Sequence, residues 1–141
     1  MSDYYRLQAL TEELIFIKWY RVAGKATKSK GQFIDDLTQL LDQAEAPIYF
    51  LSDLRQGRLV DVNIIQKLGG LTQHENYGGG SAFSKDVLSE IFVGLFSRFA
   101  APKQGESVFY ENFEDALAYL ESLKAGLAQN IDWQTVLAEF G

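Results

Sequence analysis

The sequence predicts an α/β domain with a mixed β-sheet, which begins as an antiparallel hairpin and continues with parallel strands. Two β-rich runs near the amino terminus are separated only by the polar residues Thr11–Glu13, a connection typical of a hairpin. After residue 30, β-rich runs alternate with stretches of helical periodicity, as in sheets whose parallel strands are joined by crossover helices. The run Ile48–Ser52 is apolar except for its last residue, which is typical of a strand buried on both faces. We expect four to five helices and a single domain over residues 1–141.

The first two strands are predicted over Tyr5–Leu10 and Leu14–Tyr20, followed by a polar loop over residues 21–30. A helix then begins near Lys30 and ends before Pro47, because the residue before a proline is disfavoured in helical geometry. The apolar residues of this helix recur at helical spacing and form one face: Phe33, Ile34, Leu37, Leu40, Leu41 and Ala44.

A second helix is predicted over residues 61–68, after the central strand and a polar loop. Asp61 is well placed to cap its amino terminus, and Gly69-Gly70 is expected to end it. Leu71–Gly80 is predicted to be a loop, and Ser81–Ser84 a short strand.

The third helix, predicted over Lys85–Ala100 and closed by Pro102, is the most apolar of the chain. Its main stripe contains Val87, Leu88, Ile91, Phe92, Leu95, Phe96 and Phe99. Because Val93 and Ala100 widen this stripe, the helix belongs to the core, to a homodimer interface or to the wall of an apolar pocket. The side chains assigned to such an interface or pocket are Phe83, Phe92, Phe96 and Phe99.

The chain is predicted to close with a strand over Glu106–Tyr110 and two further helices. Asn112 is a suitable N-cap for the first of them, with Asp115 three residues later. The residues of this helix predicted to face inward are Phe113, Ala116, Leu117, Leu120 and Leu123. Residues 129–141 form a helical extension, in which Trp133, Val136, Leu137 and Phe140 share one side.

The charge is unevenly distributed and acidic overall. Residues 1–30 carry six Lys or Arg against three Asp or Glu, whereas residues 31–141 carry seven against sixteen, giving a net charge of −6. An acidic body repels phosphate backbones and argues against nucleic acid as a partner. The basic cluster is interpreted as a solvated strand end and loop, or alternatively as a local anion site: Lys18, Arg21, Lys25, Lys28 and Lys30.

Neither an export signal nor a membrane span is expected. The amino terminus has no basic segment followed by an apolar one, and the most apolar run, Ile91–Ala101, is too short to cross a bilayer. The absence of cysteine excludes disulfides and fits a reducing compartment. We therefore expect a cytoplasmic protein.

No set of catalytic or metal-binding residues emerges from the sequence. His74 is the single histidine, without a second ligand or an acid that would orient it as a base. Gly78-Gly79-Gly80 lacks the Lys-Ser/Thr of a phosphate-binding loop, and no serine lies in a Gly-x-Ser-x-Gly setting. We expect no enzyme activity, no cofactor and no metal.

Four segments carry a resemblance to a known family. They are the strand pair ending in Trp19-Tyr20, the segment Pro47–Arg55, the segment His74–Asn76, and the acidic-start helix within Glu111–Leu120. In this order they resemble the SpoIIAA-like or STAS (STAS/SEC14-related) domains, over about residues 5–124. The resemblance implies a SpoIIAA-like fold and a small domain for protein interaction or ligand sensing, without catalysis.

The sequence departs from this family at its regulatory residue. In bacterial anti-sigma-factor antagonists, the strand-end Asp is followed closely by a Ser that a partner kinase phosphorylates. Here no Ser or Thr lies between Asp53 and Thr72, and Arg55 places a positive charge where a hydroxyl would be needed. The resemblance therefore implies a related interaction domain without this switch.

Two functional hypotheses follow. In the first, the domain is homodimeric and docks a protein partner at one surface that contains Asp53, Arg55, His74, Asn76 and Tyr77. In the second, it carries or senses an apolar, lipid-like small molecule in a pocket lined by phenylalanines.

Overall fold

A computed structural model describes residues 4–24, 30–99, 108–129 and 131–140. Its centre is a five-stranded sheet in the order β1-β2-β4-β6-β7. The strands are β1 (Tyr5–Ala9), β2 (Leu14–Trp19), β4 (Ile48–Asp53), β6 (Tyr77–Phe83) and β7 (Phe109–Tyr110). β1 pairs antiparallel with β2, and each following pair in the sheet is parallel. The predicted mixed sheet with an opening hairpin is confirmed.

The turn between β1 and β2 is held by one threonine. The hydroxyl of Thr11 accepts hydrogen bonds from the backbone N–H groups of Glu13 and Leu14, both at 3.1 Å. These two local hydrogen bonds hold the turn in a register in which Tyr5 lies opposite Trp19. All six residues of β2 are buried, because helices cover both faces of the sheet.

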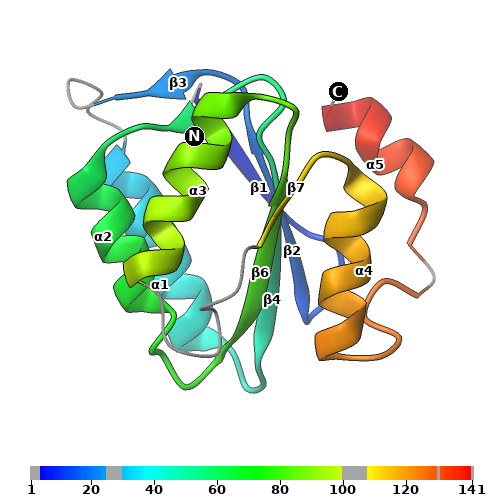
Figure 1. Cartoon of the computed structure of the whole chain (residues 1–141). Helices are drawn as coiled ribbons and strands as arrows, with labels where there is room; N and C mark the ends of the chain where they lie inside the picture. The colour runs from blue at the N-terminus through cyan, green and yellow to red at the C-terminus, as the bar shows by residue number, and fades with distance from the viewer. Residues whose placement is uncertain (1–3, 25–29, 100–107, 130, 141) are drawn as a thin grey trace.

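In the part of the chain that the structure describes, five helices form the two outer layers (Figure 1). α1 (Lys30–Gln43), α2 (Val62–Leu71) and α3 (Val87–Phe99) lie on one face of the sheet, and α4 (Phe113–Leu123) and α5 (Trp133–Phe140) lie on the other. Each face has its own apolar cluster. The larger one, beneath α1, includes Ile15, Ile17, Phe33, Leu37 and Phe50; the smaller one, beneath α4 and α5, includes Phe16, Leu51, Ala116, Leu120 and Val136.

The predicted helix caps are confirmed. The Asp61 carboxylate accepts from the backbone N–H of Asn63 at 2.9 Å, and Asn112 accepts from that of Asp115 at 2.9 Å. These bonds satisfy amino-terminal donors that have no partner within the helix. One detail of α4 differs from the prediction, since Leu123 is 40% exposed at the last turn of the helix.

The prediction that Gly69-Gly70 ends α2 is wrong. The helix continues through both glycines to Leu71. A Cβ atom at Gly69 would lie 2.3 Å from the Cβ of Phe99, so this glycine allows α2 and α3 to pack closely. The pair of glycines therefore reflects helix packing rather than termination.

The glycine triplet is likewise not a loop, because β6 begins at Tyr77 and runs through it. The register with β4 shifts between Ile48 and Tyr49, so Gly78 is an extra residue in a β-bulge. A Cβ at Gly78 would lie 2.6 Å from the ring of Tyr49. The glycines permit a bulge against an aromatic ring, a constraint that no local pattern reveals.

Two short parallel strands, β3 (Val22–Ala23) and β5 (Arg58–Leu59), form a second sheet. Both segments were predicted to be loop. Strands of two residues are too short to give a periodic signal. The predicted features at Lys25, Lys28, Ala100, Pro102 and residues 106–107 lie outside the described residues. Among the helices that the structure describes, none has the length and apolar character needed to cross a bilayer.

Candidate functional site

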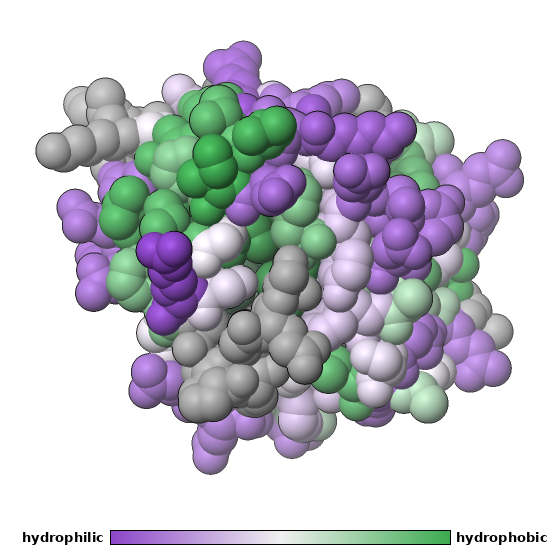
Figure 2. Space-filling model, in the orientation of Figure 1, coloured by the Kyte–Doolittle hydropathy of each residue, from purple (hydrophilic) through white to green (hydrophobic). Residues whose placement is uncertain are grey.

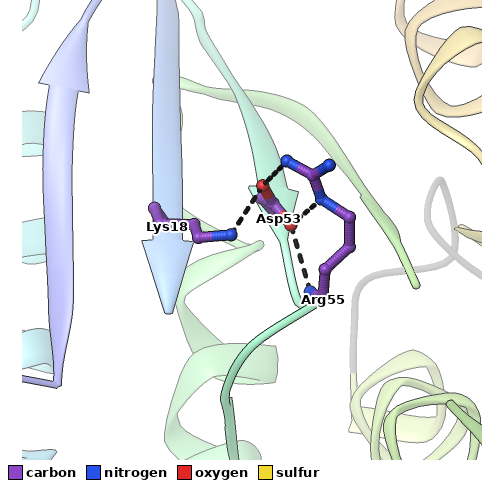
Figure 3. Close-up of polar contacts among 3 residues, drawn as sticks. All are labelled: Lys18, Asp53 and Arg55. Carbon is purple, nitrogen blue, oxygen red and sulfur yellow. Dashed lines mark hydrogen bonds and ion pairs between the residues drawn. The ribbon is translucent and has the colours of Figure 1, made fainter. Parts of the chain in front are cut away.

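The carboxyl ends of β2 and β4 bring together Lys18, Asp53 and Arg55 (Figure 3). Lys18 and Asp53 are opposite each other in the parallel register of the two strands. Oδ2 of Asp53 accepts hydrogen bonds from Nζ of Lys18 at 3.0 Å and from Nη2 of Arg55 at 2.6 Å. Oδ1 accepts from the backbone N–H and from Nε of Arg55, at 3.0 and 2.9 Å. The carboxylate thus receives four hydrogen bonds, which is close to its full acceptor capacity.

The burial of these three groups is unequal. The side chains of Lys18 and Asp53 are fully buried, whereas that of Arg55 is 44% exposed. Burial acts to raise the pKa of Asp53, but hydrogen bonds from Arg55 and Lys18 outweigh it and hold the pKa below its ordinary value. The carboxylate therefore stays ionised, and two cations around one anion leave a local charge of +1.

The guanidinium of Arg55 is also held by an aromatic ring. Its central carbon lies 5.4 Å from the ring centroid of Phe83, a distance suited to a cation–π contact. Phe83 is the last residue of β6 and pairs in register with Asp53. Asp53 and Phe83 together fix the orientation of a cation that solvent reaches.

His74 and Asn76 lie at the opposite end of the sheet. The backbone N–H of Ile48, the first residue of β4, donates to the carbonyl oxygen of Asn76 at 2.8 Å, whereas Asp53 is the last residue of that strand. The side chain of Asn76 donates to the carbonyl oxygens of Leu41 and Ala44, and Nε2 of His74 lies 2.9 Å from Oδ1 of Asp42. These contacts join the end of α1 to the start of β6.

The prediction of one surface containing all five polar and aromatic residues is therefore wrong. Asp53 and Arg55 are together, and His74 and Asn76 are together, but about 17 Å of strand separates the two groups at the usual rise per residue. Tyr77 is buried and stacks on Phe50, with ring centroids 5.9 Å apart. The error arises because residues before a parallel strand and residues after it reach opposite edges of the sheet.

Comparisons with known proteins support the fold. No family model and no curated protein sequence matches the chain. Among solved structures, the anti-sigma factor antagonist SpoIIAA in its unphosphorylated form matches with a TM-score of 0.61 and 11% identity, over 84% of this chain and 96% of that chain. An uncharacterised DUF3478 family protein from Shewanella loihica PV-4, described as having a SpoIIAA-like fold, matches with a TM-score of 0.53 and 18% identity, over 82% and 91%.

The chain has the SpoIIAA-like fold. The fold that the resemblance implied is confirmed. At sequence identities of 11% and 18%, the likeness shows the arrangement of strands and helices alone. The roles of the side chains at the site therefore follow from their own contacts.

Lys18 is the residue of this SpoIIAA-like domain that the sequence interpretation missed. It was assigned to a solvated basic cluster, yet it is fully buried against Asp53. A signal was present, because Lys18 is the single charged residue within the apolar run Leu14–Tyr20. A charge in a strand buried on both faces requires a counterion, and a strand-end Asp is a suitable one.

The third helix of the SpoIIAA-like domain faces the sheet differently from the prediction. Val87, Leu88 and Ile91 are 68%, 51% and 53% exposed, and the one residue of α3 described as buried is Ser89. Nε of Arg58 donates to Oγ of Ser89 at 2.7 Å, and Nη2 of Arg58 pairs with Asp86 at 2.6 Å. This polar anchor turns Ser89 inward, so the first aliphatic residues of the stripe face solvent.

The four phenylalanines assigned to one apolar site are divided by the sheet. Phe83 lies on the α4 side, edge-on to Phe113. Phe99 packs beside Gly69, and Phe92 and Phe96 line a cavity of about 150 Å³ between α3 and the sheet. The cavity wall is mostly apolar and also includes Phe33, Phe50, Tyr77 and Val93. Within the described residues, no cluster of three or more His, Cys, Asp or Glu side chains could hold a metal ion.

Proposed function

We propose that this chain is a non-catalytic, STAS-like interaction domain that docks a partner protein at the carboxyl edge of its sheet. The observation that carries the proposal is the state of Asp53, whose two oxygens already accept four hydrogen bonds. A carboxylate bound in this way, with a lowered pKa, is a poor general base and a poor nucleophile. Its role is to hold Arg55.

Arg55 has the properties of a docking residue. An arginine has five N–H groups, and two side-chain N–H groups of Arg55 are used by Asp53. Among the contacts of the described residues, Nη1 has no acceptor, so it can donate to a carboxylate on a partner protein. Because Asp53 and Phe83 already order the guanidinium, less side-chain entropy is lost on binding.

The proposed mode of regulation differs from phosphorylation at the strand end. The first hydroxyl after Asp53 is that of Thr72, which is buried and donates to the carbonyl oxygen of Gly69 at 2.6 Å. A kinase would not reach it without opening α2. We propose instead that binding depends on the permanent charge of Arg55. We also propose that the domain acts in the cytoplasm as a homodimer.

The Arg55→Glu variant is expected to lose a partner protein that the wild type binds. The wild type and each variant would be tagged and checked for folding by circular dichroism. Each would then be used to capture proteins from host lysate, and the bound fraction would be quantified by mass spectrometry. Lys67→Glu is the matched control, because Lys67 is an exposed cation on α2. The proposal fails if every captured protein is recovered equally by the two variants and the wild type.

The second candidate function, binding of an apolar small molecule, is favoured by the cavity under α3. An apolar cavity of about 150 Å³ is large enough for a molecule the size of benzene. Phe92, Val93 and Phe96 supply its α3 wall. A lipid tail of greater length would require α3 to move outward.

Benzene is expected to raise the melting temperature of the wild type, because a ligand that binds only the folded state stabilises it. Val93→Phe should fill the cavity and abolish this shift, whereas Leu123→Phe, on exposed surface of α4, should retain it. An unchanged melting temperature in the wild type, together with native mass spectra free of any co-purified molecule, would exclude this second function.

A further inference from the structure

The exposed face of α3 combines three features that the fold of a single chain does not explain. The first is the group of exposed aliphatic side chains Val87, Leu88 and Ile91. Figure 2 shows hydrophobic surface at the upper left of the view, in the region where Figure 1 places α3. Exposed large apolar residues gathered on one helix are typical of an interaction surface rather than of ordinary surface variation.

The second feature is Gly94, an exposed glycine in the middle of α3. A glycine at an interior helix position costs about 1 kcal/mol relative to alanine. A Cβ at Gly94 would meet no atom within 4 Å, so no close contact within the described chain requires the glycine. Gly70 is also open, but it lies in the last turn of α2, where glycine is common. The position of Gly94 therefore points to close approach by another molecule.

The third feature is a pair of opposite charges placed symmetrically about Gly94. Glu90 lies four residues before it and Arg98 four residues after it, and all three residues are exposed. Positions four residues apart lie on one face of a helix, about 6 Å apart along its axis. Neither Glu90 nor Arg98 forms an ion pair with another described residue.

We propose that α3 is the homodimer interface, with two copies packed antiparallel about a twofold axis that passes beside Gly94. In an isologous pair, each residue before the axis faces the residue equally far beyond it in the other copy. Glu90 of each copy then meets Arg98 of the other, twice. Val87 and Ile91, which lie seven and three residues before Gly94 and so share its face, lose contact with water, and Gly94 lets the two helices approach. This inference rests on the homodimer of the proposed function.

A second copy fits this face better than an unrelated partner or a lipid surface because the charges are self-complementary. An acidic residue and a basic residue equidistant from one point form two ion pairs when the helix meets itself in reverse. A lipid surface holds no charges at fixed positions that would pair with both Glu90 and Arg98, and an unrelated partner would not require the symmetric spacing. The anchor of Ser89 and Asp86 to Arg58 keeps the aliphatic residues directed outward.

The test uses charge reversal and sedimentation velocity over a concentration series of the full chain. Glu90→Arg and Arg98→Glu are each expected to weaken dimerisation about tenfold, because two ion pairs become two like-charge contacts. The double variant should restore the dimer. An equimolar mixture of the two single variants should form a heterodimer, since one chain then carries arginine at both positions and faces a chain that carries glutamate at both.

Gly94→Gln is expected to weaken dimerisation while raising the melting temperature of the monomer, because glutamine is a better helix former than glycine. Loss of the dimer can therefore not be attributed to misfolding. Gly70→Gln, at an open glycine of α2, and Lys67→Glu are the controls and should leave the dimer unchanged.

The possible outcomes separate this inference from the docking function of Arg55. A dimer that tolerates both single charge reversals and Gly94→Gln would overturn the α3 interface, although Arg55-dependent capture of a partner could still succeed. A wild-type chain that stays monomeric at every concentration would also overturn the α3 interface. So would a monomer that binds phosphatidylcholine vesicles in a flotation assay and loses this binding when Val87 and Ile91 are replaced. Restoration by the double variant and by the mixture would support it.

Discussion

Asp53→Ala is expected to lower the free energy of unfolding by about 3–5 kcal/mol, the range for removing one partner of a buried ion pair. The substitution leaves Lys18 fully buried without its counterion. Arg55 is 44% exposed and can turn toward water, so most of the loss comes from the desolvated ammonium of Lys18. Urea denaturation followed by circular dichroism would measure this loss.

The matched variants separate charge from packing. Lys18→Met should cost less than Asp53→Ala, because Arg55 still neutralises the carboxylate. The double variant Lys18→Met/Asp53→Leu should recover most of the stability, since apolar residues of similar volume can replace a buried ion pair. If Asp53→Ala and the double variant are equally unstable, the loss is due to packing, and the electrostatic account is wrong.

The same ion pair predicts a loss of stability in acid. Because the pKa of Asp53 is lower in the folded state than its unfolded value of about 3.9, folding favours the ionised form. The contribution to stability is complete above the unfolded pKa and is lost as the pH falls through the folded pKa. Asp53→Asn should lack this part of the acid dependence.

Gly69→Leu is the second large effect, with an expected loss of about 3 kcal/mol, at the upper end of the range for overpacking. The new Cβ would lie 2.3 Å from the Cβ of Phe99 and 2.7 Å from its carbonyl carbon. Because backbone atoms cannot move aside as a flexible side chain can, α2 and α3 must separate. Thermal or urea unfolding would report the change.

Gly70→Leu is the matched control for this substitution. It is the next residue in the same helix, and a Cβ there meets nothing within 4 Å. Leucine favours the helix more than glycine does, so Gly70→Leu should leave stability unchanged or raise it by up to about 1 kcal/mol. Equal losses at the two positions would show that helix propensity, not contact with α3, determines the effect of residue 69.

The sequence was sufficient for the order of the helices and of the strands of the main sheet, because these elements carry periodic signals that the two-residue strands β3 and β5 lack. The run Ile48–Ser52 and the capping residues Asp61 and Asn112 act locally, and each lies where local physical chemistry predicts. Gly69 and Gly78 were misinterpreted because their neighbours in space, Phe99 and Tyr49, are distant in the sequence. Close contacts of this kind depend on the assembled fold.

The candidate site was predictable in part for the same reason. Asp53 and Arg55 are two residues apart, so their association follows from the strand end. Lys18 joins them only through the parallel register of β2 with β4, which the element order does not specify. The orientation of α3 depends on Arg58, which the sequence interpretation placed in a loop and which instead anchors Ser89.

The central claim is that Asp53 is a permanently ionised anchor that presents Arg55, and titration of its carboxyl carbon by NMR tests this most directly. The chemical shift of Cγ, assigned with Asp53→Asn, would be followed as the pH is lowered toward the point of unfolding. We predict that Asp53 titrates below the ordinary aspartate value of about 3.9. A pKa at or above that value would mean that the hydrogen bonds from Arg55 and Lys18 do not outweigh the burial of the carboxylate, which would contradict the anchor and reopen a catalytic role.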